Sequence, residues 1–260
     1  TCFVGGETIP IGKDLKKRIR QTRTLHAAAL ESIRAVDEVK YKKAMRVISL
    51  EPDALRRMAD KTCGKLGKGQ RYLRGLYTGG TLAYETMILL KETIGDIYSN
   101  APLDKKLILA DPYKSFQNTV VDLGEEEYTK GRAHPMMDPT VRRIRLVGEA
   151  SDPEVALIAM DFVLGYGSHA DPAGAHAEAI QNAQKTAGED GRYLPILAHV
   201  CGTDKDPQNL ASQVERLERL GAMVLPTNAL MALLAWIIVE RGEVKDSTLD
   251  QAYDRYLAAV

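Results

Sequence analysis

Two adjacent glycines flanked by threonines stand where an apolar run turns directly into a helical pattern. The segment reads GLYTGGTLAYE over residues 75–85. A strand that ends in such a turn directs unpaired backbone N–H groups and the positive end of the helix dipole at one point. Thr78, Gly79, Gly80 and Thr81 therefore predict a site for phosphate or a carboxylate. The alternative is ordinary helix initiation, because neither the P-loop spacing nor a GxGxxG fingerprint is present.

Two histidines lie in long polar loops, where packing alone is a poor explanation for them. His134 follows Arg132 in GRAHPMMDP, and His169 lies in GYGSHADPAG. A histidine there can act as a nucleophile, as an acid or base, or as an anion ligand, and Arg132 can neutralise negative charge. Asp161 interrupts the apolar run LIAMDFVLG, a common place for an orienting carboxylate. These four residues are the candidate catalytic groups. The alternative for each histidine is a hydrogen bond to the backbone.

The other histidines receive no catalytic role. His199 lies inside an apolar run and is interpreted as a core residue with its hydrogen bonds satisfied. His26 and His176 lie on helical patterns. Position in a loop rather than in an element is therefore what selects His134 and His169.

From residue 71 onward, strand-like and helix-like segments alternate, and this alternation must position the candidates. The strand candidates are 72–79, 96–100, 118–124, 155–165, 193–202 and 222–227. Helical patterns cover 81–95, 138–151, 173–188, 206–221 and 228–242, with Asp206-Pro207 and Asn228 expected at the starts of the last two. Such alternation predicts right-handed crossovers and a parallel sheet covered on both faces. We therefore expect a doubly wound α/β domain.

The loops that follow the expected strands concentrate unusual residues on one edge of the sheet. They span 78–81, 98–102, 122–139, 161–174 and 201–208, and are rich in Gly, Pro, Asp, Asn and His. Ligands of doubly wound sheets bind at the carboxyl ends of the strands. The candidate substrate- or phosphate-binding residues on these loops are Thr78, Gly79, Gly80, Thr81, Asn100, Gly124, Gly165, Gly167, Gly202 and Thr203.

Composition narrows the classes of partner. Lys plus Arg and Asp plus Glu number 35 each, so no global charge favours nucleic acid or an acidic membrane surface. The three cysteines lack CxxC spacing, which argues against a disulfide framework or a zinc site and fits a reducing cytoplasm. The longest apolar run, 229–239, is too short to cross a bilayer and predicts a buried helix. No metal site is expected, and the expected location is cytoplasmic.

The loop motifs together resemble a known family. They are RGLYTGGTLAYE, SNAPL, DLGEEEYTKGRAHPMMDP, ASDPEVALIAMDFVLGYGSHADPAG and VCGTDKDPQ, in order over roughly residues 71–240. This set resembles the FdrA family, a divergent relative of succinyl-CoA synthetase that is often described as acyl-CoA synthetase-like. The resemblance implies a flavodoxin-like ligase domain. The first motif is similar to the Ser-Gly-Thr-Leu-x-Tyr-Glu turn that holds phosphate in that ligase, with Thr78 and Gly79 roughly in place of its serines.

The N-terminal part of the chain differs from the remainder. Residues 13–48 have helical spacing, a second helix is expected after Glu51-Pro52-Asp53, and 64–71 reads as a Gly/Lys linker. The opening CFVGG predicts a short strand, similar to the last strand of a preceding CoA-binding-type domain. The expected division is 1–70 as the remnant of that domain plus a helical linker, 71–242 as the ligase-type domain, and 243–260 as a helical tail.

One motif departs from the ligase pattern. Succinyl-CoA synthetases carry a phosphorylated histidine in a Gly-His-Ala-Gly motif after the strand that corresponds to LPILAHV. This sequence has CGTDKDPQN there and no histidine beyond His199. The phosphohistidine relay of the family therefore does not transfer to this chain by position.

The resemblance leaves three functions open. The first is a subunit of a phosphate-using acyl or carbamoyl transferase, like the oxamate carbamoyltransferase activity in which some FdrA-type proteins are implicated, with phosphate and a small anion as substrates. Arg132 and His134 would then neutralise the acyl donor, and His169 would serve the leaving group. The second is an acid–thiol ligase subunit that uses CoA, with His134 or His169 as phosphocarrier. The third is a non-catalytic anion-binding regulatory or scaffold subunit. All three imply companion subunits.

Overall fold

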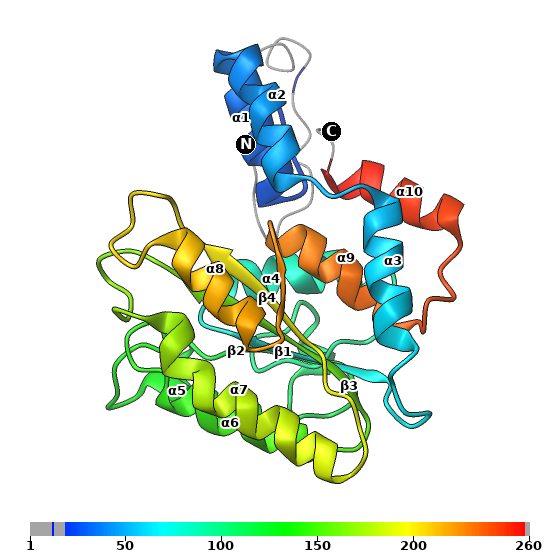
Figure 1. The fold of residues 1–260 in the computed structure, drawn as a ribbon, viewed down its shortest axis with the longest axis vertical. Coiled ribbons are helices and arrows are strands. Elements are labelled where there is room, and N and C mark those ends of the chain that lie inside the picture. Colours follow the sequence, from blue (N-terminus) through cyan, green and yellow to red (C-terminus); the bar gives the residue numbers. More distant parts are fainter. Residues whose placement is uncertain (1–11, 13–18, 258–260) are drawn as a thin grey trace.

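The chain forms an α/β unit around one five-stranded parallel sheet (Figure 1). The computed structural model describes residue 12 and residues 19–257. The strands are β1 (Tyr72–Tyr77), β2 (Thr119–Asp122), β3 (Val155–Val163), β4 (Ile196–Cys201) and β5 (Met223–Leu225). They pair in the order β2-β1-β3-β4-β5, and every pairing is parallel. The expected doubly wound, flavodoxin-like sheet is confirmed.

Helices cover both faces of the sheet. One face packs against α4 (Gly80–Leu90) and α9 (Asn228–Val239), and the other packs against α6 (Thr140–Ala150), α7 (Pro172–Glu189) and α8 (Leu210–Arg219). Strand β3 is buried over most of its length. Leu157 and Ala159 face α9, whereas Ile158 and Met160 face the opposite core. This burial on both faces explains the nearly continuous apolar run of the strand.

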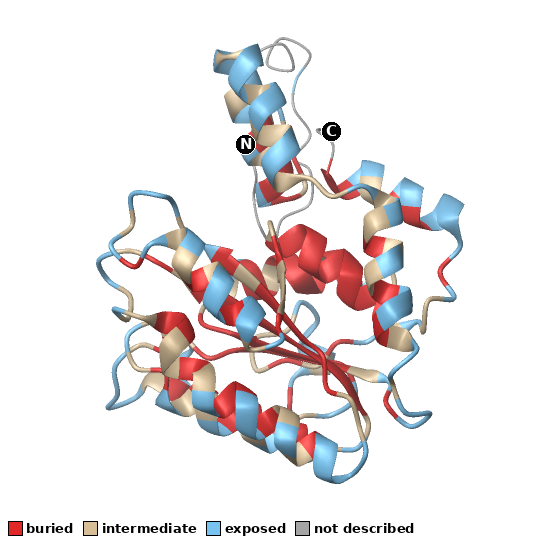
Figure 2. Cartoon of the chain, in the orientation of Figure 1, coloured by how far each residue is buried: buried red, intermediate tan, exposed pale blue. Residues whose placement is uncertain are grey.

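Helix α9 is the most apolar helix of the unit and is buried along nearly its whole length (Figure 2). Its N-cap is Thr227, whose side chain accepts from the amide of Leu230. The expectation that Asn228 caps this helix is wrong by one position. Asn228 is buried instead, and its Nδ2 donates to Leu82 O and to Glu85 Oε2 on α4. The tertiary contact with α4 therefore takes the side chain that the sequence assigned to the cap.

The N-terminal segment is helical, as expected, but it divides into α1 (Leu25–Val36) and α2 (Glu38–Ile48). Asp37 separates them with extended backbone and caps α2. Helix α3 (Pro52–Cys63) begins at Pro52, and α10 (Asp246–Leu257) closes the described chain. Thr24 Oγ1 donates to Tyr256 O at 2.7 Å, which ties the start of α1 to α10. The strand expected at CFVGG lies outside the described residues.

Two connections differ from expectation. Residues 96–100 form no named strand; Tyr98 and Ser99 make isolated bridges to Thr119 and Ile108. Helix α8 begins at Leu210, because Asn209 rather than Asp206 caps it, with a φ of 60°. The connections before and after β2 also contain the short helices η1 (Lys105–Leu107) and α5 (Glu126–Thr129).

In the described part of the chain, no helix has the length and apolar character that crossing a bilayer requires.

Candidate functional site

The candidate site lies at the carboxyl edge where β1 and β3 are neighbours. From β1 the chain crosses to β2 on one side, and β3 then continues the sheet on the other side through β4 and β5. Such a reversal of strand order opens a crevice between the loops that leave the two strands. Thr78 follows β1, and Asp161 lies near the end of β3. The two loops with the strongest sequence signals therefore meet at this point.

Asp161 organises the centre of the site. Its Oδ1 accepts from the amide of Thr78 at 2.8 Å, and its Oδ2 accepts from Thr78 Oγ1 at 2.6 Å. Arg142 of α6 forms an ion pair with Oδ1 at 2.8 Å. Asp161 and Arg142 are each 1% exposed. Both Thr78 donors are therefore engaged by a carboxylate of the protein, and Asp161 orients the turn that leads into α4.

Arg142 also determines the protonation of a neighbouring histidine. Its Nε donates to His176 Nε2 at 3.1 Å, so that nitrogen is the acceptor. The other nitrogen, Nδ1, then carries the proton and donates to Pro172 O at 2.8 Å. Burial, and secondly the charge of Arg142, hold the pKa of His176 well below its usual value. Burial likewise lowers the pKa of Arg142, while Asp161 opposes that shift. His176 is therefore a neutral support for the ion pair.

A second carboxylate stands beside the start of α4. A Cβ on Gly80 would lie 2.9 Å from Asp122 Oδ2, so the missing side chain is what lets the carboxylate approach. A Cβ on Gly124 would lie 2.8 Å from His134 Nε2 and 3.0 Å from Asp122 Oδ1. Asp122 and His134 thus converge on the same bare α-carbon. Burial raises the pKa of Asp122, and His134 acts in the opposite sense.

Asn100 holds this second carboxylate in place through the backbone. Its Nδ2 donates to Asp122 O at 2.9 Å, and its Oδ1 accepts from the amide of Asp122 at 2.9 Å. The amide of Gly124 donates to Asp122 Oδ1 at 2.8 Å. The predicted residues Asn100, Gly124 and His134 therefore come together around Asp122 at the end of β2.

The N-terminus of α4 has no side-chain cap. Gly79 is the N-cap residue, with extended backbone, and a Cβ placed there would have no atom within 4 Å. The first amides of a helix have no partner inside the helix. Among the described residues, the space over Gly79 is therefore open, next to amides and a dipole that favour an anion.

His169 lies on a loop that contacts the His134 loop. Its amide donates to Met136 O at 2.8 Å, and its Nδ1 accepts from the amide of Asp171 at 3.0 Å. Gln208 donates to its carbonyl at 3.1 Å. A cavity of only about 10 Å³ remains beneath these loops, with Thr78, Arg142, His169 and His176 among the residues that line it. The two histidine loops are thus packed together.

The remaining predicted residues lie outside this cluster. Arg132 is exposed and lines a groove along α6 with Tyr128 and Val141. Gly202 supports Leu164, because a Cβ there would lie 2.6 Å from Leu164 Cδ1. Thr203 binds Asp206 through both its amide and its hydroxyl. Gly165 and Gly167 lie on the loop that leads to His169.

Sequence reasoning missed Arg142 and assigned no role to His176 or to Asp122. Arg142 and Arg145 share the buried face of α6 with Leu146 and Glu149, at helical spacing. The available signal was the presence of charged residues on a helix face that should be apolar. Buried charges require partners, so such residues indicate a buried ion pair. The partner of Arg142 is Asp161, the residue that interrupts the apolar run of β3.

Comparison with known proteins places this architecture in a family. A profile described as CoA-ligase matches residues 76–238, which is well over half of the chain. The chain is also 45% identical over 179 residues, 69% of its length, to the uncharacterized protein YahF of Escherichia coli (strain K12). That alignment covers 35% of YahF, so the chain spans about a third of the length of this relative. The profile match begins at the end of β1 and reaches into α9, and it contains Asp122, Asp161 and the start of α4. The chain belongs to the CoA-ligase family.

Proposed function

We propose that this chain supplies the phosphate-binding part of an acyl-transfer enzyme, with the anion held at the start of α4. The observation that carries the proposal is the open space over Gly79, at the uncapped helix terminus and at the point where strand order reverses. Membership in the CoA-ligase family supports acyl-group chemistry. Phosphate or an acyl phosphate matches the positive helix terminus and the amides there.

The groups around this space have distinct tasks in the proposed reaction. The amides of Gly79, Gly80 and Thr81 bind the phosphoryl oxygens and stabilise charge that develops on them. Asp161 does not contact the substrate; it positions the turn through Thr78. Asp122 and His134 lie beside this space and exchange a proton with the leaving group or with the attacking oxygen. The ion pair with Arg142 neutralises Asp161, so this carboxylate repels an anion less than a free one would.

The resemblance to the FdrA family favours carbamoyl as the transferred group. In the proposed direction, phosphate attacks the carbamoyl carbon of oxalurate, the bond to the oxamate nitrogen breaks, and that nitrogen takes a proton. The products are carbamoyl phosphate and oxamate. His134 is the proposed proton donor, since its Nδ1 accepts from the amide of Met136 at 3.3 Å and leaves Nε2 toward Asp122.

Substitutions of Gly79 test the phosphate site directly. Its backbone is extended, with a φ of −170°, and its side-chain space is open, so other residues fit without strain. Gly79→Asp puts a fixed carboxylate where the phosphate would bind, whereas Gly79→Ser adds a neutral cap of similar reach. Both are favoured N-cap residues and preserve α4. We expect phosphate and carbamoyl phosphate to raise the melting temperature of the original chain and of Gly79→Ser, but not of Gly79→Asp.

The size of the expected effect follows from linkage. Ligand at about one hundred times its dissociation constant stabilises the folded state by about 2.7 kcal/mol. If phosphate, carbamoyl phosphate and oxamate all fail to stabilise the chain, or if Gly79→Asp responds as Gly79→Ser does, the phosphate site is wrong. A scaffold role would then be favoured.

A second candidate is an acid–thiol ligase in which His134 carries phosphate. The approach of His134 Nε2 and Asp122 to the same α-carbon favours this alternative, because Asp122 can take the proton from Nε2 and leave that nitrogen able to attack an acyl phosphate. Incubation with an acyl phosphate should then leave acid-labile phosphate on the chain, and His134→Asn should abolish the label. A transferase without a phosphohistidine gives no label in either protein.

A further inference from the structure

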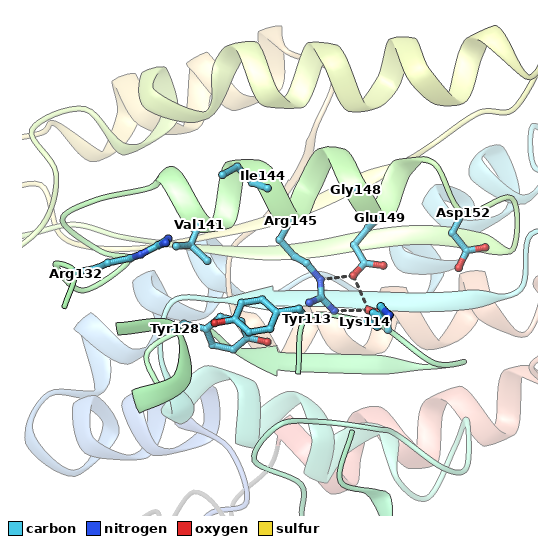
Figure 3. A pocket seen from close by; sticks show the side chains of 11 residues that line it. Tyr113, Lys114, Tyr128, Arg132, Val141, Ile144, Arg145, Gly148, Glu149 and Asp152 are labelled. Atoms are coloured by element: carbon cyan, nitrogen blue, oxygen red, sulfur yellow. Dashed lines mark hydrogen bonds and ion pairs between the residues drawn. The ribbon is translucent and has the colours of Figure 1, made fainter. Parts of the chain in front are cut away.

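A groove of about 580 Å³ runs along the outer side of α6 and shares no lining residue with the carboxyl-edge cluster around Asp122 and Asp161 (Figure 3). One wall is α6, with Val141, Ile144 and Gly148. The other wall is the segment at Tyr113 together with Tyr128 of α5. Its volume falls within the range of sites for small molecules, which is about 300–1,000 Å³.

The floor of the groove is a rigid network of buried charges. Glu149 accepts from Arg145 Nε at 2.5 Å, from Arg74 Nε at 2.8 Å and from Ser115 Oγ at 2.5 Å. Arg145 Nη1 also donates to Pro112 O at 2.8 Å, which fixes the opposite wall. Each of these charged groups has partners within the protein. The floor therefore supplies shape, and it offers no free charge of its own.

The aromatic wall offers ring faces and edges instead of hydroxyl groups. Tyr113 and Tyr128 form an edge-to-face pair with ring centroids 5.2 Å apart. The Tyr113 hydroxyl donates to Glu127 O at 2.6 Å, and the Tyr128 hydroxyl donates to Pro112 O. Tyr113 is nevertheless 58% exposed, and Ile144 on the facing wall is 67% exposed. Apolar surface is thus left uncovered on both walls.

Gly148 is the most informative residue of the groove. It lies in the last turn of α6, which ends at Ala150, and glycine is a poorer helix former than alanine. A Cβ at this position would meet no atom of the described residues within 4 Å, so neither the backbone nor packing against those residues requires glycine. A bare backbone facing an open groove permits a flat group to lie directly against the helix.

Charge differs between the two ends of the groove. Arg132 lies at one end and Asp152 at the other (Figure 3). Asp152 is engaged by Arg74 at 2.6 Å. The guanidinium of Arg132 forms no hydrogen bond or ion pair with any residue that the structure describes, although its charge acts on Asp138. Val141, beside Arg132, and Gly148 are separated along α6 by about 10 Å, from the rise of an α-helix.

We propose that this groove binds a flat aromatic molecule that carries an anionic group joined to its ring by a short linker. The ring lies against Gly148 and Ile144, facing the tyrosine wall, and the anion pairs with Arg132. This site is separate from the phosphate site proposed at α4, so either site can exist without the other.

Adenosine monophosphate is a suitable probe for the whole groove, because the ribose separates its phosphate from the adenine ring. Anilinonaphthalene sulfonate, whose sulfonate is bonded directly to its ring, is a fluorescent probe of the ring-binding part. We expect saturable fluorescence enhancement of the naphthalene probe at one site and its displacement by adenosine monophosphate. Gly148→Leu fills the groove and should weaken both probes at least about tenfold, equivalent to about 1.4 kcal/mol. Arg132→Gln should weaken adenosine monophosphate by about fivefold.

The matched control is Gly188→Leu on α7, because Gly188 is also an exposed helical glycine with no atom within 4 Å of its Cβ position. This variant should bind both probes as the original chain does. Circular dichroism confirms that each variant is folded, and the exposed Arg132 provides a second test should leucine disturb α6. Absence of a saturable site for both probes, or equal affinities in Gly148→Leu and Gly188→Leu, overturns the proposal.

Discussion

Asp161 accepts two hydrogen bonds from Thr78, one from its amide at 2.8 Å and one from its hydroxyl at 2.6 Å. This pair joins the end of β3 to the turn between β1 and α4. The turn is therefore positioned by a buried carboxylate from the neighbouring strand, which is itself neutralised by Arg142. A glycine-rich turn that is held in this way can present its remaining amides in a constant geometry.

The buried ion pair should make Asp161 essential for stability. Asp161→Asn leaves the charge of Arg142 buried without a counterion, so we expect the free energy of unfolding to fall by about 3–5 kcal/mol. Urea denaturation measures this change. Glu178→Gln removes the partner of Arg143 in a pair whose carboxylate side chain is 74% exposed, and should cost less than about 1 kcal/mol. Equal losses in the two variants would contradict the assigned role of Asp161.

Gly124 should resist enlargement even by one methyl group. In Gly124→Ala, the new Cβ meets His134 Nε2, Asp122 Oδ1 and the carbonyl oxygen of Thr78 at 2.8, 3.0 and 3.1 Å. Overpacking of this kind costs about 1–3 kcal/mol. Thermal unfolding measures the loss. Gly167→Ala, at a position with no atom within 4 Å, should change stability by no more than about 0.5 kcal/mol.

Stability should depend on the protonation of His26. This side chain is buried against Thr227, with Nδ1 3.1 Å from its hydroxyl, and burial lowers the pKa of His26 to about 4. The unfolded chain therefore binds a proton near pH 6.5 that the folded chain does not. Above that pH, His26 is neutral in both states and does not lower the free energy of unfolding. As the pH falls toward about 4, protonation of the unfolded chain lowers the free energy of unfolding by up to about 3 kcal/mol.

His26→Gln tests this dependence, because glutamine can keep a hydrogen bond to Thr227 without titrating. Unfolding free energies measured in urea across the same pH range should fall less steeply for His26→Gln than for the original chain. Burial raises the pKa of Glu85, so protonation of Glu85 increases the free energy of unfolding as the pH falls. This effect opposes that of His26, but it is the same in His26→Gln and in the original chain. Parallel pH profiles would show that His26 titrates freely in the folded state.

Asp122 should regulate anion affinity at the start of α4. Burial raises the pKa of this carboxyl, and Glu125, Asp161 and His134 also act on it. As the pH falls through that raised pKa, Asp122 gains a proton, and its repulsion of a bound anion is lost. Sulfate is a suitable probe because its charge is constant from about pH 4 to about pH 8. We expect sulfate to bind more tightly at the acid end.

Asp122→Asn removes the repulsion at every pH. Calorimetric titration should then show roughly tenfold tighter sulfate binding near neutral pH and a weaker pH dependence. Unchanged affinity near neutral pH would mean that sulfate does not bind beside Asp122.

Much of the fold could be predicted because the spacing of apolar residues in the strands and helices reflects which of their faces are buried. The run around β3 is apolar on both faces because helices cover both sides of the sheet, and its length identified a central strand. The pattern failed at residues 96–100, where a strand-like composition produces only isolated bridges. It also shifted the cap of α9, because Asn228 bonds to α4 and Thr227 caps in its place.

The candidate site could be predicted only in part. Loop positions at strand ends selected Thr78 and His134, and the interruption of an apolar run selected Asp161, which lies within β3; the fold brings all three to one edge. The partnership of Asp161 with Arg142 could not be read from spacing, because the two residues meet only after α6 packs on the sheet. Arg132 stands two residues from His134, yet it lines a different face. Proximity in sequence was a poor guide within this irregular loop.

The sheet ends in short strands on both sides, and this limits how the molecule can associate. β5 contains three residues and β2 contains four. Tyr98 also exchanges backbone hydrogen bonds with Asn118 and Val120, so part of the β2 margin is already occupied. A long edge strand with unpaired backbone groups is a template to which strands from other chains can be added. The sheet in the described residues offers little such template, so the addition of strands at its margins, and growth into β-rich fibres from the native state by that route, are disfavoured.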